Sequence, residues 1–525
     1  MSYIQSNISS PQQNDNVNIR PLEALMNDLK EKMELVFHDR ASIDQLETER
    51  GLPPFVLQEI MSINPLSVCI GKEYGGRGAY THEILQLLAT TSYESLSLCL
   101  TFGINAALFL QPFAKYGQEE VKAPVFKRFL EEKAMGGLMI TEPNFGSDAL
   151  NMQTSYSEKE GRYHLKGTKH WAGLTGWADY WLMTARRQSD RGDLERDIDF
   201  FLVDVNAPRQ GIVVEEIFKT LGLYSIPYGQ NHIEVEVPAT HRLQPHTTGI
   251  KMMLDLLHGS RMQFPGMGMG FIQRMLDEAM AHSRQRFVGG RSLLTYDQVQ
   301  HRLSRLQASY TVCTAMCVNS SNKVSLQRDM SPHGLEANAV KSVITDLMQE
   351  AAQSAMQLIG AKSYKLNHIV GRATIDSRPF QIFEGSNDIL YAQITEGLMK
   401  LMKRARVQHV YQFLKGYDLT DRAADYVKEL MNFKLDMEMP QRKTVELGKA
   451  IGRIISLNQV LDLAQKGFRK DLVEEAIVFL RQDISKLMAD FSFNDKSTVI
   501  EDYQENSNWT QFIRERFHRT PVNSV

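Results

Sequence analysis

The spacing of hydrophobic residues changes twice along this chain, and these changes limit the possible folds more than any other feature. Residues 20–135 carry apolar residues at three- and four-residue intervals, which predicts amphipathic helices. Residues 136–241 hold short β-rich runs separated by Gly, Asn, Asp and Pro, which predicts strands. From residue 242 the helical spacing returns. This order disfavours a doubly wound sheet, in which strands and helices alternate.

The chain therefore divides into a leader and four folded parts, and the predicted fold class is α+β. The leader is polar and rich in Ser, Asn and Gln, so it is expected to be disordered. Helical runs are predicted in the last part at 422–435, 445–465 and 474–491. In chain order the parts are the leader (1–19), a helical domain (20–135), an all-β domain (136–241), a helical bundle (242–404) and a helical extension (405–525).

Composition narrows the function classes. A formal net charge of −3 over 525 residues argues against a nucleic-acid binder. Cys313 and Cys317 lie one helical turn apart without the further ligands of a metal site, so buried free thiols are expected and no metal is predicted. No window approaches about 18 uninterrupted apolar residues, so no transmembrane segment is predicted. The leader lacks the apolar core of a signal peptide, and a cytoplasmic location is expected.

Two segments concentrate residues that can carry chemistry. In "MITEPNFGSDALNMQTS" (139–155) an apolar strand ends at Thr141, and a turn exposes Gly146 and Ser147. Strand-end amides and such a turn offer donors to an anionic or carbonyl-rich ligand, although an ordinary β-turn has the same pattern. In "RPFQIFEGSNDILY" (378–391) Glu384 lies between apolar residues and a Gly-Ser-Asn turn. Glu384 is either an acid at a helix N-terminus or a base presented to a substrate.

Together these segments resemble the acyl-CoA dehydrogenase flavoprotein family. "KEYGGRGAY", "TEPNFGSD", "GTKHWAGLTGWAD", the segment from Arg261 to Gln298, "QLIGA" and "IFEGSNDI" occur in the order that this family shows. The resemblance extends over residues 40–402, about 70% of the chain. It implies N-terminal helices, a β-barrel-like middle domain and a C-terminal four-helix bundle, with FAD bound between them.

The resemblance also implies which residues bind FAD. Ile140 and Thr141 would contact the flavin ring, and Trp171 would cover its outer face. Gly146 and Ser147 would lie near the pyrophosphate and the thioester end of the substrate. A neighbouring subunit would bind the far end of FAD, which implies a homodimer or homotetramer. The predicted cofactor-binding residues are Ile140, Thr141, Gly146, Ser147, Trp171, Gly173, Arg286 (or Arg284), Gln298, Gln357, Gly360, Ser386 and Asp388.

By the same resemblance, Glu384 is the catalytic base. It would remove the α-proton of an acyl thioester while the flavin takes the β-hydrogen as hydride, giving a trans-2-enoyl thioester. Phe380, Ile382 and Phe383 are expected to exclude water and raise the pKa of Glu384. Some branches of the family place the base where this chain has Ser260, so Glu384 is the matching candidate. The predicted substrate-binding residues are Ser147, Arg261 and Gly385.

Several departures indicate a divergent member with a C-terminal helical extension. Gly173 replaces a Thr or Ser whose hydroxyl would bond the flavin; either Thr175 supplies that hydroxyl or the reactivity of the flavin is altered. Ala361 replaces a glycine, and Phe383 replaces a Tyr. Pro379 lies close before the predicted base.

The resemblance leaves the substrate and the electron acceptor open. An acyl group on CoA and one on a carrier protein are both compatible, as are an electron-transfer flavoprotein and, for an acyl-CoA oxidase, oxygen. A flavin-containing DNA-protection protein is less favoured, because residues 401–525 hold 20 Lys and Arg against 18 Asp and Glu. A degenerate scaffold without catalysis is disfavoured by the joint presence of Glu384, Thr141, Ser147 and Trp171.

Overall fold

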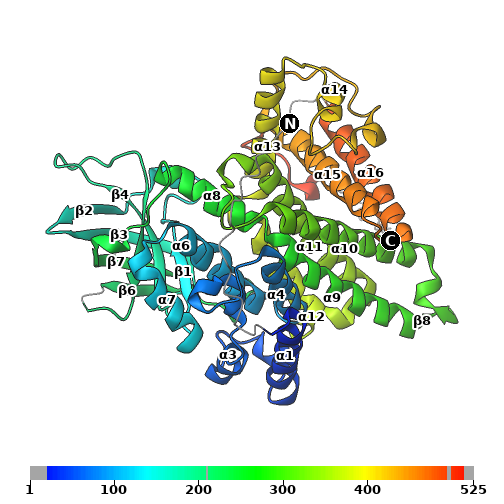
Figure 1. The fold of residues 1–525 in the computed structure, drawn as a ribbon. Helices are drawn as coiled ribbons and strands as arrows, with labels where there is room; N and C mark the ends of the chain where they lie inside the picture. Colours follow the sequence, from blue (N-terminus) through cyan, green and yellow to red (C-terminus); the bar gives the residue numbers. More distant parts are fainter. Residues whose placement is uncertain (1–19, 209–210, 494–497, 513–525) are drawn as a thin grey trace, which may run out of the picture.

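The computed structural model describes residues 20–208, 211–493 and 498–512, and the predicted leader lies outside these ranges (Figure 1). The predicted N-terminal helical region is confirmed. Its longest helix is continuous from Leu96 to Tyr116, because a π-helical stretch (Ile104–Leu110) joins α5 to α6. This helix is apolar and long enough to cross a membrane, but 89% of its most apolar window is buried inside the protein, as in a core helix. The helices are α1 (Leu22–Glu34), α2 (Ile43–Leu46), α3 (Pro54–Met61), α4 (Thr81–Glu94), α5 (Leu96–Gly103), α6 (Gln111–Tyr116) and α7 (Glu119–Glu131).

The middle region is a seven-stranded sheet at one end of the molecule (Figure 1). Its strand order is β1-β4-β2-β3-β7-β6, with β5 paired to β4. The ladder between β3 and β7 shifts register between Lys169 and Ala172, and Trp171 in this bulge has φ +56°. A bulge turns a side chain away from the regular alternation, so Trp171 faces outward with 51% of its surface exposed. The strands are β1 (Gly136–Met139), β2 (Ser155–Lys159), β3 (Arg162–Gly173), β4 (Tyr180–Arg187), β5 (Asp199–Asp204), β6 (Ile212–Ile217) and β7 (Tyr228–Pro238).

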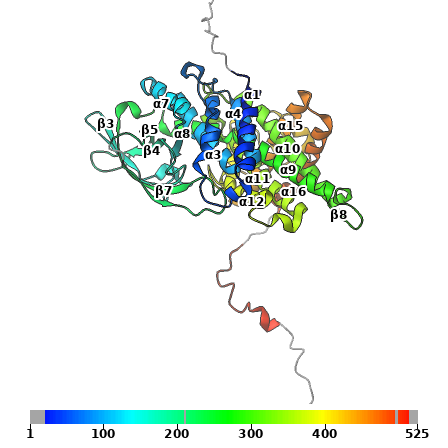
Figure 2. The ribbon, with the colours of Figure 1, turned by 90° about the horizontal axis from the view of Figure 1, so that it is seen from below.

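A helical bundle follows the sheet and occupies the centre of the molecule (Figures 1 and 2). Helix α9 packs against α4, α10 and α11. A Cβ atom at Gly270 would collide with the Ala89 carbonyl, so this glycine permits the close approach of α9 to α4. Cys313 is buried, Cys317 is half-buried, and both are free thiols. The elements are α8 (Gly249–Arg261), α9 (Phe264–Gln285), β8 (Phe287–Val288), β9 (Arg291–Ser292), α10 (Asp297–Lys323), α11 (Gly334–Ile359), α12 (Ile369–Asp376) and α13 (Asn387–Ala405).

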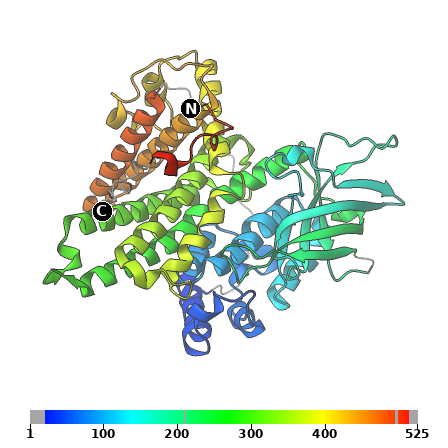
Figure 3. The same cartoon turned by 180° about the vertical axis from the view of Figure 1, so that it is seen from behind.

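The extension packs on the side of the bundle away from the sheet (Figure 3). Its helices are α14 (Val410–Lys415), α15 (Gln441–Gln465) and α16 (Lys470–Ser492). The helical runs predicted at 445–465 and 474–491 are confirmed.

The helical run predicted at 422–435 is wrong, because this segment holds only a 3-10 turn at Ala424–Val427. Some of its backbone groups form short local turns, and others bond to partners outside the segment. The N–H groups of Val410 and Tyr411 donate to the carbonyls of Phe433 and Met431. The side chain of Asn458 accepts from the N–H of Arg422 at 2.9 Å. These tertiary contacts replace the i to i−4 bonds that a helix would make.

Candidate active site

The segment that carries Glu384 has an unusual backbone. It follows a 3-10 turn (Arg378–Gln381) and leads into α13. Glu384 has φ +52° and Gly385 has φ +91°. A left-handed conformation costs a non-glycine residue about 1–2 kcal/mol, so the surrounding structure must hold it.

Two buried cations hold the carbonyl groups of this turn. Arg261, at the end of α8, donates to the Glu384 carbonyl from Nη2 at 2.8 Å and from Nε at 3.1 Å. Lys341 on α11 donates from Nζ to the Gly385 carbonyl at 2.8 Å. Both carbonyls therefore face these cations. The N–H groups of Glu384 and Gly385 have no hydrogen-bond acceptor among the residues that the structure describes. These two donors are free to bind a ligand.

One oxygen of the Glu384 carboxyl group is hydrogen-bonded, and the other has no partner among the described residues. Ser260 donates from Oγ to Glu384 Oε1 at 2.9 Å, whereas Oε2 is buried and has no hydrogen-bond partner within the described part of the chain. Burial raises the pKa of Glu384 above its ordinary value, against the opposing effects of Arg261, the Ser260 hydrogen bond and Lys341. A carboxyl group with a raised pKa and one uncommitted oxygen has the properties of a general base.

Glu384 lies in the wall of a cavity of about 450 Å³, to which the N-terminal helices, the sheet and the bundle all contribute. Apolar side chains such as Leu100, Ile104 and Leu138 line it together with a few polar groups. Such a composition is typical of a ligand site. Of the residues predicted from the sequence, the cavity is lined by Ile140, Thr141, Gly146, Ser147, Trp171, Gly173, Arg261, Glu384 and Gly385.

The other predicted site residues do not line this cavity. Gln298 and Gln357 line a separate cavity of about 440 Å³ between α10 and α11. Ser386 precedes the first turn of α13, and Asp388 in that turn is exposed. The remaining two are Arg286, at the end of α9, and Gly360, at the end of α11.

A buried ion pair fixes the part of the sheet that reaches the cavity. Lys169 Nζ donates to Glu142 Oε1 at 2.9 Å, and Glu142 also accepts from the N–H of Thr154 at 3.0 Å. Burial lowers the pKa of Lys169 to about 8. The Thr141 carbonyl accepts from the N–H of His170 at 2.8 Å. These contacts set the position of Ile140 and Thr141 after β1.

Aromatic packing around the base differs from the prediction at one residue. Phe380 is fully buried, and its ring lies 4.9 Å from that of Phe383 and 6.2 Å from that of Phe264. Ile382 was also expected to exclude water, but that prediction is wrong, since 55% of its surface is exposed. The backbone turn before Glu384 points Ile382 outward, and the aromatic cluster alone shields this side of the base.

Thr175 does not reach the cavity that Gly173 lines. Its hydroxyl donates to the Ala172 carbonyl at 2.7 Å and accepts from Asn231 Nδ2 at 3.1 Å, and the residue is buried. Tyr228 on β7 instead pairs directly with Gly173 on β3, and a Cβ atom at Gly173 would lie 3.1 Å from the Tyr228 ring. Burial, with a smaller contribution from Glu384, raises the pKa of Tyr228. Tyr228 therefore supplies a cavity hydroxyl that sequence reasoning missed.

Sequence reasoning also missed Lys341, although its position within an apolar helical run indicates a buried charge. It lies within the apolar run of α11, and a lysine on the buried face of a helix requires a partner. Burial lowers its pKa to about 7. Ser260 was noted only because it is not acidic, yet it is a direct partner of Glu384.

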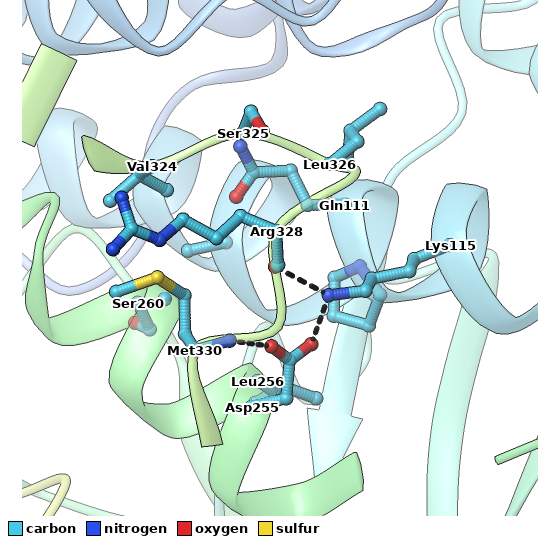
Figure 4. A pocket seen from close by; sticks show the side chains of 13 residues that line it. Gln111, Lys115, Asp255, Leu256, Ser260, Val324, Ser325, Leu326, Arg328 and Met330 are labelled. Carbon is cyan, nitrogen blue, oxygen red and sulfur yellow. Dashed lines mark hydrogen bonds and ion pairs between the residues drawn. The ribbon is translucent and has the colours of Figure 1, made fainter. Parts of the chain in front are cut away.

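Ser260 also lines a second, smaller cavity (Figure 4). Lys115 lines this cavity, and its Nζ donates to Asp255 Oδ2 at 2.8 Å and to the Arg328 carbonyl at 2.7 Å. Its volume is about 40 Å³, which is room for one or two water molecules. It cannot hold an acyl group or a cofactor.

Comparison with known proteins identifies the family. Three family models match consecutive parts of the chain: the acyl-CoA dehydrogenase N-terminal domain (30–133), middle domain (137–236) and C-terminal domain (247–399). The chain belongs to the acyl-CoA dehydrogenase family. It is therefore an oxidoreductase of a family whose members depend on FAD.

Individual relatives are distant. An acyl-CoA dehydrogenase of Bacillus subtilis (strain 168) is 26% identical over 352 residues, which are 66% of this chain and 90% of the relative. The crystal structure of an acyl-CoA dehydrogenase complexed with FAD from Bacillus anthracis has a TM-score of 0.73 at 16% identity, covering 96% of this chain and 92% of that one. The prolyl acyl carrier protein oxidase AnaB has a TM-score of 0.63 at 19% identity, covering 71% and 98%. The fold shared with the Bacillus anthracis structure includes most of the extension.

Proposed function

We propose that this acyl-CoA dehydrogenase family member performs α,β-dehydrogenation of an acyl thioester, with Glu384 as the base. The observation that carries the proposal is the state of the Glu384 carboxyl group. It has a raised pKa and a buried oxygen without a partner in the described residues, and it lies in the wall of the largest apolar-lined cavity described above. Removal of an α-proton beside a thioester requires such a group.

The backbone turn supports the second requirement of this chemistry. An α-proton becomes acidic enough to remove when donors polarise the adjacent carbonyl group. The free N–H groups of Glu384 and Gly385 are proposed as such donors, since Arg261 and Lys341 hold the neighbouring carbonyls on the other side. The same turn thus presents base and donors together. The product would be a trans-2-enoyl thioester.

The cavity fits a flavin. Thr141 and Ser147 bring hydroxyl groups that have no hydrogen-bond partner among the described residues, and Ile140 and Trp171 bring apolar surface. FAD bound there would supply the oxidant that accepts the β-hydrogen as hydride. Thr141 and Gly173 would face the ring, Trp171 would cover it, and Gly146 and Ser147 would lie along the pyrophosphate. Arg261, Ser147 and Gly385 are proposed to contact the substrate.

The far end of FAD is proposed to bind a second copy of this chain. Six of the predicted residues do not line the cavity of their own chain, and two of them, Gln298 and Gln357, line another cavity. A homodimer or homotetramer would bring that second cavity to the FAD of its neighbour. Ser386 and Asp388 stay predictions for the same cofactor. The residues proposed to act across subunits are Arg286, Gln298, Gln357 and Gly360.

Two acyl carriers and two electron acceptors are proposed, each in order of preference. CoA is proposed first, because the family models and curated relatives are named for acyl-CoA. A carrier-protein substrate is the second candidate, since the fold is shared with an acyl carrier protein oxidase. An electron-transfer flavoprotein is the proposed acceptor, and oxygen is the alternative.

The purified protein is expected to be yellow, with one flavin per subunit. Its absorbance should bleach anaerobically with the correct thioester, because transfer of the β-hydrogen as hydride would reduce the flavin while Glu384 takes the α-proton. The measurement is a titration with acyl-CoAs of different length and branching, followed by their carrier-protein forms. Reoxidation by air and by an electron-transfer flavoprotein then separates oxidase from dehydrogenase. A colourless protein that binds no added FAD would contradict the proposal.

Ser260→Ala is expected to move the pH dependence of flavin reduction to higher pH. The Ser260 hydrogen bond lowers the pKa of Glu384, and its loss raises that pKa further. The active carboxylate is present above the pKa and is lost as pH falls through it. A hydrogen bond worth about 1 kcal/mol corresponds to a shift of about 0.5–1 unit. Stopped-flow reduction across about pH 5 to 9 measures the midpoint.

Ser325→Ala is the matched control for this shift, because Ser325 lines the small cavity of Figure 4 and does not line the cavity that holds Glu384. Its midpoint should equal that of the wild type. An unchanged or lower midpoint in Ser260→Ala would show that the serine does not tune the base.

A further inference from the structure

One carboxylate of α11 is bonded to both ends of the segment that carries Glu384. Asp346 Oδ1 accepts from Gln381 Nε2 at 2.8 Å and from Asn387 Nδ2 at 2.7 Å. Gln381 lies three residues before Glu384, and Asn387 lies three residues after it. These two hydrogen bonds hold both ends of segment 381–387 against α11.

Asn387 extends this contact to the cation below the turn. Its Oδ1 accepts from Lys341 Nζ at 3.0 Å, and the same Nζ donates to the Gly385 carbonyl. Its Nδ2 donates to the Ser342 carbonyl at 3.2 Å and to Thr345 Oγ1 at 3.0 Å. The hydrogen-bond network thus runs from Asp346 to the residue next to Glu384.

The extension places a buried guanidinium beside this network, at ion-pair distance and without a hydrogen bond to it among the described residues. Arg453 on α15 has a side chain that is 7% exposed, and its Nη2 lies 4.0 Å from Asp346 Oδ2. Its Nη2 lies 3.8 Å from Glu350 Oε1, and its Nε lies 3.8 Å from Asp483 Oδ2. Arg305 on α10 also pairs with Glu350 and with Asp483, at 2.8 Å in each case. Among the described residues, Arg453 is thus the arginine within ion-pair distance of Asp346, and its positive charge attracts the carboxylate that binds Gln381 and Asn387.

Helix α15 also makes a close backbone contact with α13. A Cβ atom at Gly448 would collide with the Tyr391 carbonyl, so the two helices touch directly. Tyr391 in turn donates from its hydroxyl to Asp346 Oδ2 at 2.6 Å. Helix α15 packs against α13 and α10, as the views from the front and from behind show (Figures 1 and 3). The extension is thus in contact with the helix that follows Glu384.

We propose that Arg453 is a positioning residue for the base: it holds Asp346, which fixes the ends of segment 381–387 and so the orientation of Glu384. The extension is then part of the catalytic apparatus. This inference rests on the proposed role of Glu384 for its effect on catalysis, but the positioning itself concerns residues of this chain alone.

Hydrogen exchange and flavin reduction test the proposal together. In the FAD-bound protein, Arg453→Gln is expected to speed amide exchange in peptides covering 381–387 about tenfold and to slow flavin reduction at saturating thioester by a similar factor. The substrate KM should stay within about twofold, since no group that touches substrate has changed. Arg453→Lys keeps the charge and should recover most of both effects.

Asn458→Ala provides the control. Asn458 is a buried residue of the same helix, and among the described residues its side chain bonds to Arg422, Ala423 and Asp418 of the extension. It should lower the unfolding temperature without changing exchange in 381–387. Unchanged exchange in Arg453→Gln, or an equal increase in Asn458→Ala, would overturn the inference. If no thioester reduces the wild-type flavin, the proposed function fails, while the exchange measurement still decides the role of Arg453.

Discussion

Replacing Glu384 with glutamine is expected to leave a yellow protein whose flavin is not reduced by any acyl thioester. Glutamine keeps the size of the side chain and can still accept the Ser260 hydrogen bond through its amide oxygen. It cannot take a proton, however, and a positioned base contributes about 10²–10⁴-fold to such a step. The expected loss in the rate of anaerobic reduction is therefore about 10²–10⁴-fold. Stopped-flow absorbance measures this rate.

Two controls separate chemistry from folding in Glu384→Gln. The FAD content and the unfolding temperature of the variant should match the wild type. Glu278→Gln, which removes an acid paired with Arg274 on α9, should reduce at the wild-type rate. Glu384→Asp retains a carboxylate on a shorter side chain and should keep measurable activity. Reduction of Glu384→Gln within tenfold of the wild-type rate would mean that another group is the base.

Lys341→Met is expected to slow flavin reduction about 100-fold with little change in KM. Lys341 donates to the Gly385 carbonyl and to Asn387 Oδ1, so its loss leaves two buried acceptors without this donor. The turn can then relax and move the base and the free N–H groups from their positions. Loss of the positive charge also raises the pKa of Glu384, so the variant should need higher pH than the wild type.

The pH profile distinguishes this role from a purely structural one. Burial lowers the pKa of Lys341 to about 7, so its positive charge is present below that pH and is lost above it. The wild type should show a second transition near pH 7 that Lys341→Met lacks. Lys341→Arg should retain part of the activity. Lys323→Met removes a lysine whose partner is Glu336, and it should behave as the wild type. Equal profiles in wild type and Lys341→Met would contradict the assignment.

Much of the fold followed from local patterns. The change of period near Gly136 and near residue 242 predicted the boundaries between helices and strands, because period 2 and period 3.6 arise from backbone geometry within a few residues. The predicted run at 422–435 failed for the opposite reason. Its backbone groups bond to residues 410, 411 and 458, and no local pattern records such partners.

Some features of the candidate site could likewise be predicted from contiguous sequence, whereas others depended on the tertiary structure. Glu384, Gly146 and Trp171 stand out in the sequence because turns and motifs are contiguous, and all three line one cavity. Ile382 belongs to the same contiguous segment, yet only the path of the backbone decided that it faces outward.

The sequence by itself determined the order of helices and strands, the family, and one acid set in an apolar turn. Only the tertiary structure decided what surrounds that acid. Ser260 is separated from Glu384 by 124 residues, and Lys341 from Gly385 by 44. Tyr228 lies opposite Gly173 only because β3 and β7 pair in that register. The pKa and orientation of a base depend on such neighbours, and packing of distant segments brings them together.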